Sequence, residues 1–409
     1  MVHFKKTLTI LAFLWMGMGS AMAGVNSDEQ IVAEPFRGET RGSKLSINYD
    51  DFSAILKQTV VKAGHSDRRY STKAPPAAGS RVTRGSTKST RLEGNRIDFH
   101  SYLGENLATL VRLRDDIASV PTILPLSDMS RNEQLSYWLN LYNLTLITQV
   151  VSIFPESNLK KFHSSRNKRQ LWEEKVITVA GVPLSLNDIQ FKVILPKFHN
   201  PLVMYGLFQG VIGGPNIRDE AFTGDKVWKQ LEDNAREFVN SNRGARVRNK
   251  KLQVSVLYET NAALFPDFQA AVGKHIHAYA KPRFQQQVTA GIKVKVKQKN
   301  WDIADLYAGH KGTGSAANTN GAALLGAIRS GGAGGAGASS GGEQGGAIAS
   351  AWIGMMQSHN MSGTRFPAHV VEFLHRKERR DRKMRVGEVG VEEQVPDKET
   401  EETDDVKPK

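Results

Sequence analysis

The sequence predicts an α+β fold, in which one helix-rich domain carries a small antiparallel sheet, and three patterns support this class. The run from Ser130 to Val150 is apolar at nearly every helical position, which is typical of a buried helix. The segment 176–184 predicts a hairpin that turns at Ala180–Gly181. Helical and strand patterns then interleave without regular strand–helix–strand units, which favours antiparallel pairing.

The helix after Ser130 has the strongest signals. Ser130 precedes Glu133 by three residues, which predicts a capping box in which each side chain satisfies a free amide at the helix start. Large apolar residues recur at helical spacing up to Val150, and Pro155 ends the run. We therefore expect a buried helix here.

The other elements are predicted from shorter patterns. Val203–Phe208 is an apolar run bounded by Pro201 and Gly210, and it predicts a buried strand. The alternation of Ile292, Val294 and Val296 with lysines predicts a half-buried strand whose outer face is a lysine row. Further elements are expected as a weak helix at 49–61, a short helix capped by Asn187 and reaching Leu195, a helix at 226–242, a strand at 252–257 and a helix at 261–280.

The ends of the chain predict export and low complexity. Lys5 and Lys6, an apolar run at 8–18 and the small-residue site Ala21–Ala23 predict a secretory signal peptide cleaved near Ala23, with an uncleaved anchor as the alternative. We expect a periplasmic or secreted protein without a transmembrane segment after processing. The expected organisation is a signal peptide at 1–23, a polar linker at 24–46, a domain at 47–305, a Gly/Ala/Ser-rich linker at 306–350, and a mostly disordered basic helix and acidic tail at 351–409.

Composition limits the chemistry. The 409 residues include 55 Lys and Arg against 41 Asp and Glu, a net charge of +14. Because Lys5 and Lys6 leave with the signal peptide, the mature chain keeps +12, which favours anionic partners. The chain has no cysteine, so disulfides, thiolate metal sites, iron–sulfur clusters and thiol nucleophiles are excluded.

The segment Glu133–Asn143, EQLSYWLNLYN, closely resembles the signature helix of domain of unknown function 547. Further landmarks of that family follow in the same order, among them 181–189, 201–207, 214–218, 221–223, 267–268 and 300–302. The resemblance covers roughly 47–305, and the Trp-Asn-Tyr-Asn helix is its most specific part.

Four positions depart from the family pattern. The resemblance implies histidines where this chain has Phe191 and Met204, and cysteines where it has Gln209 and Gly214. A member without them could not perform thiol–imidazole chemistry in the same way. The resemblance therefore favours a non-catalytic member.

Four residues are candidates for ligand binding. Asn140 and Asn143 lie three apart on the buried helix, so their amides need partners. They either tie the helix to neighbouring backbone, which we favour, or bind a ligand. Gln209 and Arg218 flank a glycine-rich turn, where a ligand could approach the backbone closely.

Catalytic and metal sites have weaker support. Ser185 could pair with His163 or His199 as a serine hydrolase, but no nucleophile-elbow pattern surrounds any serine. His275 and His277 are two apart in a predicted helix and point in different directions, so they are poor joint ligands. We expect no catalytic residue, metal or cofactor.

The sequence supports two hypotheses about function. The first is an exported binding or structural module of the cell envelope, with anionic envelope polymers or another envelope protein as partner and no nucleic acid. The basic loop at 62–93, the stretch 243–251 and the Lys293 row could form its anion-binding surface, although the charge could also be merely solubilising. The alternative is a hydrolase of amide or ester bonds that uses serine or water, with His163 or His199 as base.

Overall fold

The computed structural model describes residues 32–68, 89–163, 169–309, 373, 376 and 377. The predicted signal peptide, the Gly/Ala/Ser-rich segment from residue 310 onwards and the acidic tail lie outside these residues. The α-helices are α1 (Asp50–Thr59), α2 (Glu105–Ile123), α3 (Arg131–Ser152), α4 (Leu195–Phe198), α5 (Val227–Val239), α6 (Val256–Thr260), α7 (Phe268–Tyr279) and α8 (Pro282–Gln285). The strands are β1 (Val60–Val61), β2 (Arg96–Ile97), β3 (Ile177–Val179), β4 (Val182–Leu184), β5 (Ala245–Arg248), β6 (Lys251–Ser255) and β7 (Lys293–Gln298).

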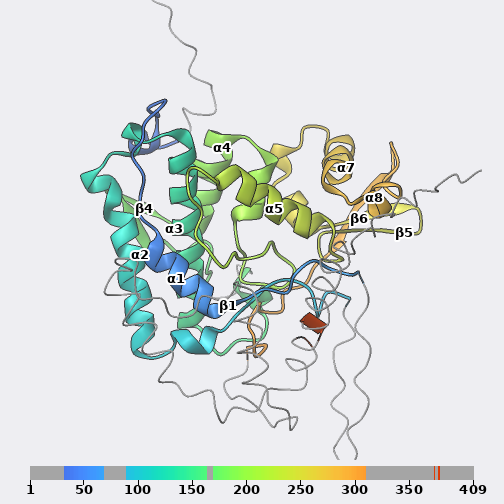
Figure 1. Cartoon of the computed structure of the whole chain (residues 1–409), viewed down its shortest axis with the longest axis horizontal. Helices are drawn as coiled ribbons and strands as arrows, with labels where there is room; N and C mark the ends of the chain where they lie inside the picture. The colour runs from blue at the N-terminus through green and yellow to red at the C-terminus, as the bar shows by residue number, and fades with distance from the viewer. Residues whose placement is uncertain (1–31, 69–88, 164–168, 310–372, 374–375, 378–409) are drawn as a thin grey trace, which may run out of the picture.

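Shorter helical turns join these elements. The 3-10 helices are η2 (Glu34–Phe36), η3 (Phe99–Tyr102), η4 (Leu126–Asp128), η5 (Leu159–His163), η7 (Pro201–Gly206) and η8 (Ala262–Leu264), and η6 (Asp188–Ile194) is a π-helix that continues into α4. Figure 1 shows α1 and α2 at one end of the molecule and α7, α8 and the sheet β5–β6–β7 at the other, with α5 between them. The α+β class with small antiparallel pairings is confirmed, because β1–β2, β3–β4 and β5–β6 are all antiparallel.

Helix α3 forms the centre of the core. Every residue from Glu133 to Val151 is buried, and the helix packs against α2, α5 and η6. Ser130 caps it as predicted, accepting the amide of Glu133 at 3.3 Å. The other half of the expected capping box is wrong, since Glu133 instead accepts the amide of Ile47 at 2.9 Å and so fixes the entry of α1.

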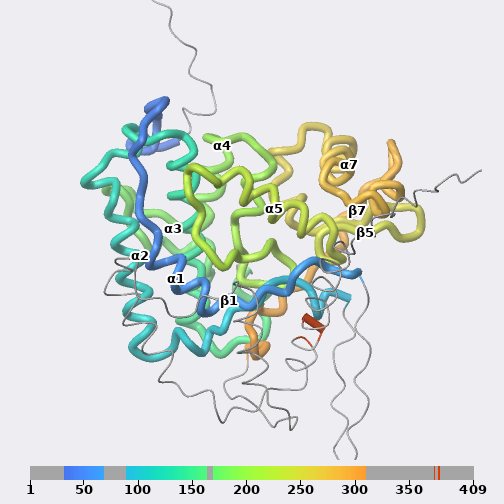
Figure 2. Tube along the Cα trace, viewed as in Figure 1, coloured from blue at the N-terminus to red at the C-terminus, as the bar shows by residue number. Residues whose placement is uncertain are grey.

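The segment before residue 47 packs onto the domain instead of only leading to it. Val32 and Phe36 are fully buried, and the Phe36 ring meets Trp138 of α3 edge to face, with centroids 4.9 Å apart. The ammonium of Lys197 binds the carbonyls of Phe36 and Gly38, at 3.0 Å for Gly38. Figure 2 shows this blue segment running beside the teal chain of η4 and the start of α3.

The predicted strand at Val203–Phe208 is wrong, because the chain forms the 3-10 helix η7 there. Asn200 caps η7 by accepting the amide of Leu202 at 2.9 Å. Side chains from helices satisfy the backbone around its end. The Asn143 amide donates to the carbonyl of Gly206 and accepts the N–H of Phe208, and Asn234 donates to the carbonyl of Tyr205. Since these polar groups already have partners, the segment needs no neighbouring strand.

Three other boundaries differ from the predictions. Asn187 does not cap a helix, because the helical turn begins after Ser185 and passes through η6. The predicted strand at 252–257 stops at Ser255, whose hydroxyl accepts the amide of Leu257 and starts α6. The predicted helix at 261–280 is divided into η8 and α7 at Pro266, which has no amide hydrogen to donate.

The lysine strand is confirmed as β7, with Val294 buried and Lys293, Lys295 and Lys297 exposed. β7 pairs with β6 in parallel, so the three-stranded sheet is mixed. A parallel neighbour requires a long connection, and α6, α7 and α8 supply it between the two strands. Beyond residue 309 the structure describes Phe373, which is buried with Arg96 lying over its ring at 5.2 Å, and Arg376, which pairs with Asp67 at 3.2 Å. The described part of the chain contains no helix that is both long and apolar enough to span a bilayer.

Candidate functional site

The two asparagines of α3 are tied to the backbone. The amide of Asn140 donates to the carbonyl of Phe222 and accepts its N–H, both at 2.8 Å. Asn143 donates to the carbonyl of Gly206 at 2.9 Å and accepts the amide of Phe208 at 2.9 Å. Both side chains are buried. This is the arrangement expected if they fasten the helix to two neighbouring loops.

Two of the four positions that depart from the family pattern lie side by side. A Cβ atom placed on Gly214 would lie 3.1 Å from the Cβ of Gln209. Met204 is fully buried in η7, whereas Phe191 on η6 is 39% exposed. The structure thus brings the two expected cysteine positions together and gives the two expected histidine positions different environments.

The glycine-rich turn packs closely against a distant segment of the same chain, at Asn300. A Cβ on Gly213 would lie 2.5 Å from the carbonyl oxygen of Asn300, so only glycine allows this approach. Arg218, at the far side of the turn, donates to the carbonyl of Gln230 at 3.1 Å and pairs with Glu220 at 2.6 Å. Arg218 therefore anchors the turn to α5.

Ser185 has a structural role at the start of a helix. Its hydroxyl accepts the amide of Asp188 at 3.1 Å, and its own amide donates to the Asp188 carboxylate at 2.9 Å. Burial opposes ionisation of this carboxyl, but hydrogen bonds from Lys192 and Ser185 outweigh it and lower the pKa of Asp188 to about 2. The proposed base His163 stacks on Trp172, with ring centroids 3.7 Å apart. Ser185 and Asp188 thus form a capping box.

Two parts of the predicted anion-binding surface, the stretch 243–251 and the Lys293 row, come together in the sheet β5–β6–β7. Residues 69–88 of the third part, the basic loop at 62–93, lie outside the described residues. One face of the sheet is apolar and contacts α6 and α7, with Leu252, Val254 and Val294 buried. The opposite face is basic. Arg248, Lys251 and Lys293 form one cross-strand row, and Arg246, Gln253 and Lys295 form the next. No ion pair joins any of these cations to a carboxylate among the described residues.

Two hollows open on this basic side, and Arg246 lines both. The smaller has a volume of about 190 Å³ and is lined by Ser89, Thr90, Gly213, Arg243, Arg246, Lys297, Gln298, Lys299 and Asn300. The larger has a volume of about 500 Å³ and is lined by Arg68, Asn242, Arg246, Val247, Arg248 and Gln287. Neither lining contains a carboxylate. Within the described ranges, no group of three or more acidic or histidine side chains could hold a metal ion.

The buried α3, the loops it fastens and the basic sheet define a helix-rich α+β domain. Residues 126–239, from η4 to the end of α5, match the family described as "Protein of unknown function, DUF547". This match supports the domain family inferred from the signature helix. No curated protein and no solved structure matches the chain.

The basic sheet lies outside the matched segment, and of the residues that line the two hollows Gly213 alone lies inside it. Sequence reasoning predicted the basic stretches, but it missed the smaller hollow. The side chains of Thr90, Arg243 and Asn300 come from three distant segments. A hydrogen bond of 2.8 Å from Asn300 to Thr90 joins two of these segments.

Proposed function

We propose that this protein is an exported, non-catalytic binding module of the cell envelope that holds an anionic polymer on the basic face of β5–β6–β7. The observation that carries the proposal is the pair of cross-strand rows. Arg248, Lys251 and Lys293 are direct neighbours, Arg246 and Lys295 flank Gln253 in the next row, and no described carboxylate pairs with these cations. Such a face attracts a chain of negative charges and releases its counterions.

The two hollows also lie on this basic side of the sheet. Because Arg246 lines both, the two hollows are neighbours on the surface of the domain. A polymer needs a surface of this kind, on which several successive charges can be held at once. Lys5 and Lys6, the apolar run at 8–18 and the small-residue site Ala21–Ala23 support the export part of the proposal.

The non-catalytic part of the proposal rests on candidate polar side chains that already have hydrogen-bond partners within the protein. Asn140 and Asn143 bind backbone, and Ser185 belongs to a capping box. Turnover of an amide or ester substrate by the purified protein, lost in His163→Ala or His199→Ala, would instead support the hydrolase alternative.

A polymer-binding assay tests the main proposal. The probe is fluorescently labelled dextran sulfate, compared with uncharged dextran of equal length, and titrated at several salt concentrations. We expect binding of dextran sulfate only, weakening steeply as salt rises. The triple variant Lys251→Gln, Lys293→Gln, Lys295→Gln should lose at least about tenfold in affinity, since each removed contact accounts for about 0.5 kcal/mol or more.

The control removes the same charge elsewhere. Lys44, Lys57 and Lys160 are exposed lysines outside the sheet, and neutralising all three should change the affinity far less. Equal losses in the two triple variants would show that net charge alone drives binding, and the proposed surface would be rejected. Mass spectrometry of the exported chain, with Gly24 as first residue, tests the expected processing.

A further inference from the structure

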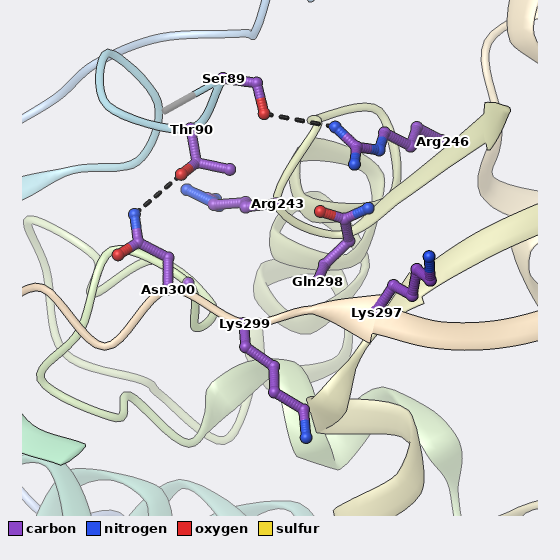
Figure 3. Close-up of a pocket in the computed structure, with 9 residues that line it drawn as sticks. Ser89, Thr90, Arg243, Arg246, Lys297, Gln298, Lys299 and Asn300 are labelled. Carbon is purple, nitrogen blue, oxygen red and sulfur yellow. Dashed lines mark hydrogen bonds between the residues drawn. The ribbon is translucent and has the colours of Figure 1, made fainter. Parts of the chain in front are cut away.

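We propose that the smaller hollow binds one phosphoryl group, with the guanidinium groups of Arg243 and Arg246 as its main ligands. The inference rests on the proposed polyanion binding and specifies the chemical group that is recognised. Figure 3 shows the side chains of Thr90, Arg243, Arg246 and Asn300 around one space.

The size of the hollow suits a small group. Its volume of about 190 Å³ is below the roughly 300–1,000 Å³ of pockets that enclose drug-sized ligands. The lining side chains that converge on it are polar, whereas the ammonium of Lys299 points away (Figure 3). The hollow therefore fits a single charged group, with the rest of a ligand outside it.

Arg243 has donors without partners. The residue is 1% exposed, and only its Nη2 pairs with a carboxylate, that of Glu237. Its Nε and Nη1 are buried without a hydrogen-bond partner. Nη1 lies against Gly94, where an added Cβ would be 2.2 Å from it. A buried guanidinium N–H left unpaired is unfavourable, so a ligand oxygen that reaches Nε or Nη1 from the hollow satisfies a donor that the protein itself leaves open.

Arg246 and two hydroxyls complete the set of donors. Arg246 uses Nε to reach Gln253 at 3.1 Å and Nη1 to reach Ser89 at 3.4 Å, which leaves Nη2 for a ligand. Thr90 accepts from Asn300 at 2.8 Å, so its own hydroxyl proton remains available to donate. The hydroxyl of Ser89 likewise accepts from Arg246, so its own proton also remains available to donate.

The charge of the site matches a dianion. No carboxylate lines the hollow, and Lys297 adds its charge to that of Arg246 and to Arg243, which is paired with Glu237 behind the lining. A phosphate monoester carries about −1.5 to −2 charges and three strong acceptor oxygens, whereas a carboxylate has one charge and two oxygens. Two guanidiniums and two hydroxyls match the phosphoryl group better.

Calorimetric titration of the mature protein tests the inference. The probes are inorganic phosphate, glycerol 1-phosphate and acetate, all at the same pH and ionic strength. We expect both phosphates to bind and acetate to bind at least about tenfold more weakly. Binding of inorganic phosphate without glycerol 1-phosphate would assign the site to the free ion, while comparable binding of both assigns it to a group carried on a larger molecule.

Variants locate the binding. Arg246→Gln should weaken phosphate binding at least about tenfold, since it removes a cation and a charge-assisted hydrogen bond to the ligand. Arg246→Lys keeps the charge and loses the planar fork, so it should also bind more weakly than wild type. Lys44→Gln is the matched control, because Lys44 is an exposed lysine that lies outside the sheet and outside the lining of the hollow.

A second variant protects the test against misfolding. Because Arg243→Gln alone would leave Glu237 buried without its cation, the double variant Arg243→Gln, Glu237→Gln is compared with wild type after circular dichroism confirms its fold. It should bind phosphate at least about tenfold more weakly.

Two outcomes overturn the inference: equal weakening by Arg246→Gln and Lys44→Gln, or acetate binding as tight as phosphate. Retained dextran sulfate binding without phosphate binding would reject the phosphoryl site alone. Phosphate binding without dextran sulfate binding would reject the polymer surface alone.

Discussion

Replacing Asn140 by leucine should strongly destabilise the domain. The two side chains are similar in size, so the change removes polarity while it keeps volume. In the structure the Asn140 amide is the partner of both the N–H and the carbonyl of Phe222, each at 2.8 Å in a fully buried setting. Leaving a buried polar group unsatisfied costs about 1–3 kcal/mol, so the two groups together predict a loss of about 2–6 kcal/mol. That is a large part of a typical domain stability of about 5–15 kcal/mol.

The measurement is urea unfolding followed by far-ultraviolet circular dichroism, with the free energy of unfolding extrapolated to water. The matched control is Thr145→Val on the same helix, because Thr145 is fully buried and its hydroxyl has no hydrogen-bond partner. Removing an unsatisfied hydroxyl while keeping the shape should leave stability unchanged or raise it by about 1 kcal/mol. A loss below about 1 kcal/mol for Asn140→Leu, or an equal loss for Thr145→Val, would refute the reasoning.

Three further predictions concern other contacts. Lys197→Met should lower the free energy of unfolding by about 2–4 kcal/mol and speed proteolysis near residue 38, because the ammonium binds two carbonyls of that segment; unchanged proteolysis would contradict it. Burial lowers the pKa of His275 to about 4, below the ordinary 6.5, so its neutral form stabilises the fold above pH 6.5 and this stability is lost as pH falls through 4. His275→Gln should therefore flatten the pH dependence of the urea midpoint between pH 7 and 4, and an unchanged slope would count against this cause. The pair Gln209→Cys, Gly214→Cys should form a disulfide under air, because a Cβ–Cβ separation of 3.1 Å is within a few tenths of an ångström of the disulfide range; two free thiols in a thiol assay of the unreduced protein would contradict it.

The elements predicted correctly from the sequence are those whose pattern is local. Helix α3 is apolar on all sides, and β7 alternates valine with lysine. In each case the residue pattern of the segment alone indicates which of its side chains are buried. Helix α2 has no such signal, because its exposed side is strongly charged and Pro121 lies within it. It was not predicted, and its place depends on its contact with α3.

Other features depend on partners distant in the sequence. Phe36 belongs to the core because Trp138 receives its ring, and nothing in the polar stretch around it indicates that contact. The turn at η7 replaces a strand because side chains of α3 and α5 satisfy its backbone. The basic stretches of the candidate site were visible in the sequence. The hollow between them was not, since it forms only when Thr90 meets Asn300.

The basic sheet also has a consequence for the unliganded domain. Arg248 lies opposite Lys251, and Lys251 lies opposite Lys293, so like charges face each other across two strand pairs. Such pairs repel and weaken the sheet that holds them. Ionic strength should therefore act in two opposite directions: added salt screens the repulsion and strengthens the free fold, while it loosens the hold on a polymer. A polyanion that settles on this face relieves the same repulsion and adds its binding free energy to the stability of the sheet.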